Sequence, residues 1–113
     1  MLSAHLPNGF LLIDSAQRAK EHSNSWAHPH QEALNQIEPG YFVKVGVTHP
    51  ELSGERFWGI VKQRKGRNLV IQVDQDLIYT AQHGIRDRDF LSVCEENVFG
   101  ITDSRGNSIW EAK

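Results

Sequence analysis

From residue 41 onward, apolar and polar residues alternate with a period of two, the spacing of a β-strand with one buried face. Val43 and Val45 fall on one side of the first such segment and Lys44 on the other. Turn residues bound each alternating segment, which favours short strands joined by tight connections. The predicted strands are 41–47, 55–62, 68–74 and 90–94, followed by a last hairpin over 101–110. The segment 55–62 is apolar on both sides, which is typical of a central strand.

The part of the chain before residue 40 has a helical pattern instead. After the apolar segment 10–13, Asp14 or Ser15 is placed to cap a helix over 16–21, because a short side-chain oxygen accepts hydrogen bonds from first-turn amides. A second helix is predicted to begin at Pro29, a residue that suits the first helical turn. Its residues Ala33, Leu34 and Ile37 are spaced to share one helical face, and we expect this face to pack on the sheet.

One or two helices before several short strands predict an α+β fold in a single domain spanning 1–113. The segment 1–39 would pack on a sheet formed by 40–113. We expect that sheet to be a strongly bent antiparallel sheet or a small SH3-like β-barrel. The expected core consists of Val43, Val45, Trp58, Ile60, Leu69, Ile71, Val73 and Phe90.

Composition narrows the function classes. The 113 residues include 12 Lys and Arg and 14 Asp and Glu, so the formal net charge is -2. A general binder of nucleic acid or anionic membranes is usually basic overall, although a local basic patch remains compatible with this charge. The single cysteine, Cys94, excludes an intramolecular disulfide and fits a reducing compartment. Without a signal-like N-terminus or a long apolar run, we expect a cytoplasmic protein that does not associate with membranes.

Several residues are arranged as in a known bacterial family. Pro39-Gly40 leads into Val43-Lys44-Val45, and the next strand contains Glu55-Arg56-Phe57-Trp58. With the looser match Arg18-Ala19, this order resembles the bacterial domain of unknown function DUF2314 over roughly positions 14 to 110. The second half departs from that pattern, since Arg88 stands where the family has glycine. The resemblance implies a similar fold, and it implies no substrate or activity because the family has none assigned.

The aromatic residues are more numerous than one face of a small sheet needs, so we expect some of them to be exposed. Exposed aromatic clusters usually mark interfaces. The first functional hypothesis is therefore a non-enzymatic module that binds a protein or peptide, or that forms a homodimer. The interface candidates are Tyr41, Trp58, Tyr79 and Phe99.

A basic run at a predicted hairpin tip supports an alternative. Phosphates need several positive charges on one surface, and a neighbouring exposed aromatic ring can stack on a base. The second hypothesis is therefore a nucleic-acid-binding small barrel. The alternative is that the run is an ordinary solvated turn. The residues concerned are Lys62, Arg64, Lys65 and Arg67.

Three further sets of residues suggest chemistry, each with a structural reading that we prefer. His28 and His30 are weak candidates for a zinc site, because the Pro between them breaks helical spacing. Cys94 suits a small buried thiol more than a nucleophile. Two Asp-x-Asp pairs suggest a small enzyme with an Asp or His site within 74–89, although Asp also serves as a turn residue. These pairs are Asp74, Asp76, Asp87 and Asp89. We expect no metal and no cofactor.

Overall fold

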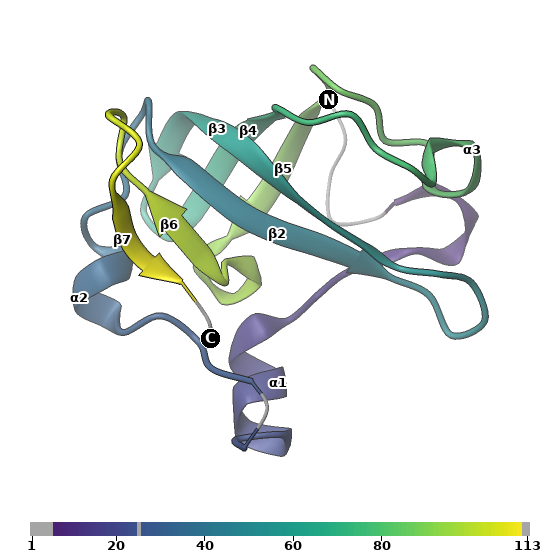
Figure 1. Ribbon diagram of the computed structural model, residues 1–113, viewed down its shortest axis with the longest axis horizontal. Helices are drawn as coiled ribbons and strands as arrows, with labels where there is room; N and C mark the ends of the chain where they lie inside the picture. The colour runs from purple at the N-terminus through teal and green to yellow at the C-terminus, as the bar shows by residue number, and fades with distance from the viewer. Residues whose placement is uncertain (1–5, 25, 112–113) are drawn as a thin grey trace.

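A computed structural model describes residues 6–24 and 26–111, which form an α+β arrangement dominated by one antiparallel sheet (Figure 1). Within those residues the sheet has seven strands in the order β5-β4-β3-β2-β6-β7, and β1 pairs with β2 beside β6. The strands are β1 (Leu11–Leu12), β2 (Phe42–Thr48), β3 (Glu55–Lys65), β4 (Asn68–Val73), β5 (Phe90–Cys94), β6 (Gly100–Thr102) and β7 (Ser108–Glu111).

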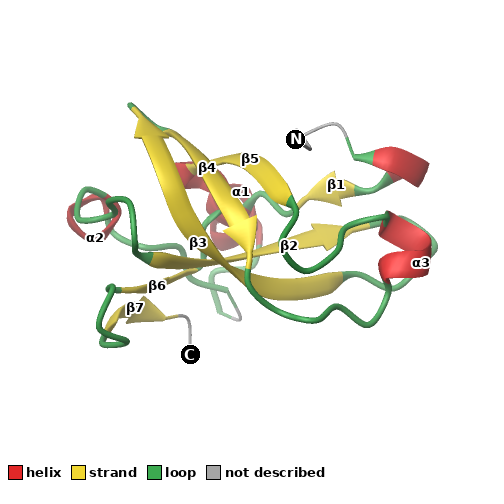
Figure 2. Ribbon diagram, turned by 90° about the horizontal axis from the view of Figure 1, so that it is seen from above, coloured by secondary structure: helices red, strands yellow, loops and turns green. Residues whose placement is uncertain are grey.

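Three α-helices flank the sheet in the described part of the chain: α1 (Ser15–Glu21), α2 (Gln31–Leu34) and α3 (Thr80–His83). The predicted cap of α1 is confirmed, because the Asp14 side chain accepts a hydrogen bond from the Gln17 amide. Helix α2 is shorter than predicted, but its predicted face is buried through Ala33, Leu34 and Ile37. Helices α2 and α3 lie at opposite ends of the sheet (Figures 1 and 2).

The sheet bends along β3, its longest strand (Figure 2). The first half of β3 pairs with β2 and the second half with β4, and the register shifts between Val61 and Gln63. An irregularity of this kind adds local twist and lets one strand serve two differently oriented parts of a sheet. The terminal strands β5 and β7 do not pair with each other, so the sheet is not closed and an SH3-like barrel is not confirmed.

The core forms on one face of the sheet, and the expected core was partly wrong. Residues Val43, Val45, Leu69, Ile71 and Val73 are buried as predicted. On β3, however, Phe57 and Val61 are the buried residues, whereas Trp58 and Ile60 are half-buried on the opposite face. Phe90 is also on that face and is 42% exposed.

The packing at Gly59 explains why this face of β3 turns inward. A Cβ atom at Gly59 would lie 2.8 Å from the Ile71 Cδ1 atom, so the glycine makes room for an isoleucine of the neighbouring strand. Phe57 and Val61 flank Gly59 on the same side of β3 and fill the core around it. Both sides of the segment are apolar, so the sequence alone did not distinguish the two orientations.

None of the helices in the described part of the chain is long and apolar enough to cross a membrane. The expectation that the first residues of the chain form no signal peptide rests on residues 1–9, and residues 1–5 of that stretch lie outside the described residues.

Candidate functional site

The face of the sheet turned away from the core carries a row of paired residues across four strands. Phe42, Ile60, Gln72 and Phe90 lie directly opposite one another on β2, β3, β4 and β5. Directly paired residues project to the same side of a sheet, so these side chains form one continuous band. We call the surface formed by Phe42, Lys44, Trp58, Ile60, Val70 and Phe90 the outer face.

The interface candidate Trp58 lies on the outer face, one outward position along β3 from Ile60. It pairs with Lys44, whose Nζ atom lies 5.8 Å from the centre of the indole ring. The ring also passes close to Gly100, where an added Cβ would lie 3.1 Å from the ring and 2.8 Å from the Lys44 Cβ. The ring is therefore held between a lysine and the backbone, with a cation over its π-system.

The charge of the outer face is one-sided at β2 and β3. The outward positions of these two fully described strands carry Lys44 and Arg56 and no carboxylate. The chain as a whole has a net charge of -2, so this region is locally basic on an acidic molecule. The outer face thus combines aromatic and aliphatic groups with positive charge.

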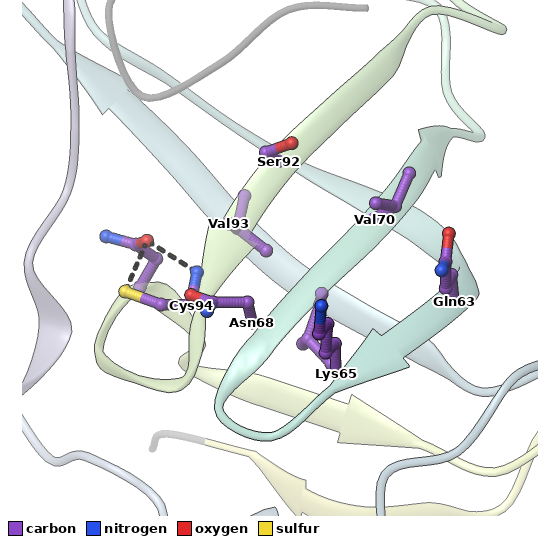
Figure 3. Close-up of a pocket in the computed structure, with 9 residues that line it drawn as sticks. Gln63, Lys65, Asn68, Val70, Ser92, Val93 and Cys94 are labelled. Carbon is purple, nitrogen blue, oxygen red and sulfur yellow. Dashed lines mark hydrogen bonds between the residues drawn. The ribbon is translucent and has the colours of Figure 1, made fainter.

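A depression of about 410 Å³ continues the outer face over β3, β4 and β5 (Figure 3). Val70 and Ser92 form one of its cross-strand pairs, and they lie one outward position along from Gln72 and Phe90. Gln63 and Lys65 of β3 border it on one side. The depression therefore adjoins the band of paired residues.

Cys94 lines this depression but is poorly suited to act as a nucleophile. Its thiol donates a hydrogen bond to Asn97 Oδ1 at 3.2 Å, and its backbone amide donates to the same oxygen at 3.0 Å (Figure 3). Burial raises the pKa of Cys94 to about 11. The reactive thiolate is therefore scarce at neutral pH.

A second cavity, of about 530 Å³, contains the interface candidate Tyr79 together with Glu55, Ile78 and the arginines Arg18 and Arg56. Tyr79 is half-buried. It lies in residues 75–89, between two predicted strands, where the sequence predicts no strand. We call these residues the irregular segment. Glu55, at the start of β3, is 8% exposed. The structure therefore brings the interface candidate Tyr79 beside a buried carboxylate.

Glu55 and His83 hold the irregular segment against β3. The Glu55 carboxylate accepts hydrogen bonds from the amides of Ile78 at 2.7 Å and Tyr79 at 3.0 Å, and from His83 Nε2 at 2.9 Å. His83 Nδ1 accepts from the Ile85 amide at 3.0 Å, which places the ring proton on Nε2. The sequence reading missed this pair, because 28 residues separate the partners.

The protonation chemistry of Glu55 fits a structural role. Burial raises the pKa of this carboxyl, but the hydrogen bonds from His83, Ile78 and Tyr79 outweigh burial and hold the pKa below its ordinary value of 4.5. A general base for neutral pH needs the opposite shift. Glu55 therefore fixes the backbone of the segment and is a poor proton acceptor.

The predicted acidic site within 74–89 is not assembled as a cluster. Asp87 accepts a hydrogen bond from the Gln75 amide at 3.1 Å, and Asp89 accepts from the Arg86 amide at 2.9 Å. Asp74 and Asp76 are exposed. Asp89 thus serves a local turn, which is the alternative that we weighed against catalysis, whereas Asp87 joins two parts of the segment twelve positions apart. Among the described residues, no group of three or more His, Cys, Asp or Glu could hold a metal ion.

The two histidines suggested for zinc have different surroundings. His28 Nδ1 lies 2.9 Å from the Ser15 hydroxyl oxygen, which also accepts a hydrogen bond from the Trp26 indole. Burial lowers the pKa of His28. His30 is exposed and precedes α2.

Half of the predicted basic run is engaged in ion pairs. Arg64 pairs with Glu95, which is 1% exposed, and donates hydrogen bonds to the carbonyls of Leu34 and Ile37. Arg67 pairs with Glu95 and Glu96. Lys62 and Lys65 are exposed. The run therefore joins α2 to the β3–β4 hairpin, and two of its four charges are committed to carboxylates.

The four aromatic interface candidates do not form one cluster. Trp58 belongs to the outer face and Tyr79 to the second cavity, while Tyr41 packs against the core. Phe99 is 2% exposed and contacts Trp26 edge-on at 5.2 Å. It therefore contributes no exposed surface.

Comparisons with protein-family models, with curated proteins and with solved structures found no match to this chain. The resemblance to DUF2314 stays a prediction.

Proposed function

We propose that this protein is a non-enzymatic module that binds an acidic polypeptide segment on its outer face. The observation that carries the proposal is the band formed by Phe42, Ile60 and Phe90. It lies beside the cationic Lys44, and the outward positions of β2 and β3 carry no carboxylate. A segment that alternates apolar and acidic side chains would bury its apolar groups on this band. Its carboxylates would meet Lys44 and Arg56.

Nucleic acid suits the outer face less well. A base needs the free face of an aromatic ring, and the ring of Trp58 already has the Lys44 ammonium group over it. The arginines of the basic run are paired with Glu95 and Glu96. An apolar and acidic ligand requires neither a free ring face nor those arginines.

A second copy of the chain is also disfavoured as the occupant. A two-fold interface brings the same patch of both molecules together, so Lys44 and Arg56 would approach their own equivalents. Like charges opposed in this way are repelled. A partner with acidic groups has complementary charge.

The test uses a labelled synthetic peptide in which glutamate alternates with leucine, and a second peptide with lysine in place of glutamate. We expect the acidic peptide to bind saturably and the basic peptide not to bind. Ile60→Ser should weaken binding by about tenfold, because it removes apolar contact area from the band. The matched control is Ile78→Ser, since Ile78 is 81% exposed and lies off the outer face.

Three outcomes would overturn the proposal. The first is equal binding of both peptides, and the second is an equal effect of Ile60→Ser and Ile78→Ser. The third is displacement of the peptide by mixed oligonucleotides that themselves bind tightly at low salt, which would favour the nucleic-acid hypothesis. Thermal melts of both variants establish that each is folded.

A further inference from the structure

Two arginines share one tryptophan beside the outer face. The Arg18 guanidinium carbon lies 5.1 Å from the centre of the Trp26 ring, and that of Arg56 lies 4.9 Å from it. Arg18 comes from α1 and Arg56 from β3, so the ring joins two elements that are distant in the sequence. Both contacts are in the range of cation–π interactions.

The Trp26 ring that both arginines contact is fixed. The Trp26 indole N–H donates to the Ser15 hydroxyl at 3.1 Å, and Phe99 contacts the ring edge-on. Ser15 and Phe99 are both buried. The two guanidinium groups are therefore held near one anchored support, and little conformational freedom is lost when a ligand binds them.

Neither guanidinium group forms an ion pair or a hydrogen bond with the residues that the structure describes. The nearby carboxylate of Glu55 is occupied by His83 and two backbone amides. Glu21 borders the same region but forms no ion pair with either arginine. Both positive charges line the same two hollows, so an anion bound there beside both of them would be stabilised.

Both arginines stand where two hollows meet. They line the cavity of about 530 Å³ that contains Tyr79 and also an adjoining hollow of about 460 Å³ beside Trp26. Ile78 and Tyr79 supply apolar and aromatic surface in the first cavity. A ligand in this open cavity has access to two cations and to the apolar surface of Ile78 and Tyr79.

We propose that Arg18 and Arg56 bind the oxyanion group of a small organic phosphate or carboxylate whose apolar part lies against Ile78 and Tyr79. Guanidinium groups suit both anions, because their planar N–H donors match two oxygens at once. Phosphate and carboxylate share this chemistry, so the experiment must separate them. In this site the anion approaches Arg56 from the cavity. Anion binding there does not depend on whether the outer face binds a peptide.

The experiment follows the indole N–H resonance of Trp26 by NMR while phenyl phosphate, phenylacetate or uncharged phenol is added to the full chain. Trp26→Phe assigns this resonance among the three tryptophans of the chain. We expect a saturable shift with at least one anion and none with phenol. The anion with the lower dissociation constant shows whether the site prefers a phosphate or a carboxylate. Binding should weaken at least about tenfold in Arg18→Gln or Arg56→Gln and should weaken with added salt.

The matched control is Arg105→Gln, an exposed arginine in the β6–β7 turn. It should bind the anion as the unchanged protein does. The proposal is wrong if neither anion shifts the Trp26 resonance, if phenol shifts it equally, or if Arg105→Gln weakens binding as much as Arg18→Gln. Failure of this test with retained binding of the acidic peptide would leave the proposed function standing, and Ile60→Ser should leave anion binding unchanged.

Discussion

At the scale of single residues, the buried charges of this protein serve the backbone. Glu55 receives three hydrogen bonds, two of them from amides of a segment that has no strand of its own. Backbone amides turned away from water need hydrogen-bond partners, and a carboxylate can accept several at once. His83 completes this arrangement and bonds in turn to the Ile85 amide. The shape of the second cavity therefore depends on one ionised side chain.

The first prediction concerns the pH dependence that Glu55 confers. Its pKa in the folded protein lies below the ordinary value of 4.5, so the ionised form favours folding. This stabilisation is fully present above about pH 5 and is lost as the pH falls through the folded-state pKa. We expect Glu55→Gln to lower the free energy of unfolding at pH 7 by about 2 kcal/mol, because its amide group would face hydrogen-bond donors. Urea unfolding at a series of pH values measures both effects.

The control for this experiment is Glu38→Gln, which alters an exposed carboxylate. The unfolding free energy of the Glu38 variant should follow that of the unchanged protein at every pH. Stability of Glu55→Gln should fall less steeply below about pH 5, since the group responsible is gone. An equal acid slope in all three proteins would show that Glu55 does not carry this dependence.

At the scale of elements, Glu95 links three parts of the fold. It lies in the single helical turn Glu95–Asn97, it pairs with Arg64 and Arg67 of the β3–β4 hairpin, and it accepts from Gln31 of α2. Arg64 also donates to two carbonyls at the end of α2, where helical carbonyls lack partners within the helix. Two of the four residues in the basic run, Arg64 and Arg67, therefore connect parts of the fold.

The second prediction follows from this role of Glu95. Glu95→Ala leaves Arg64 without its buried carboxylate, and removing one partner of a buried pair costs about 3 kcal/mol. We expect a corresponding loss in the free energy of unfolding, measured with urea. Glu96→Ala, which removes the more exposed partner of Arg67, should cost less than about 1 kcal/mol. Similar losses for both variants would contradict the assignment of this role to Glu95.

At the scale of the whole molecule, the charge distribution bears on self-association. Net charge is -2, yet β2 and β3 present positive charge outward beside the apolar band. Strands β5 and β7 end the sheet, and unpaired edges of this kind are available for pairing with another chain. Two routes to a dimer therefore exist, through the outer face or through an edge, and the first brings like charges together.

The third prediction is that the purified protein is a monomer of 12.9 kDa at low salt. Repulsion between outer faces is strongest there, because few ions screen it. Light scattering after size exclusion, at low and high salt, measures the mass. A dimer that persists at low salt and is lost in Ile60→Ser would contradict the charge argument and make a second copy the occupant of the outer face.

The sequence by itself determined most of the elements, although it did not predict α3. Alternation located the strands, the short polar side chain of Asp14 marked the start of α1, and the spacing of Ala33, Leu34 and Ile37 identified a buried helical face. Each of these features depends on residues that are close in the sequence, so a local sequence pattern is enough to predict it. The same local chemistry predicted a turn role for the aspartates of 74–89, and Asp89 has that role through its hydrogen bond from the Arg86 amide.

Only the tertiary structure decided which face of β3 is inside and which charges meet. Phe57 and Trp58 are both large and apolar, and the choice between them came from the fit of Gly59 against Ile71. The pairs Glu55–His83 and Arg64–Glu95 join residues about thirty positions apart, and the contact of Arg18 and Arg56 with Trp26 joins α1 to β3. Partners at such separations leave no periodic trace in a sequence, because their meeting depends on how the whole sheet bends.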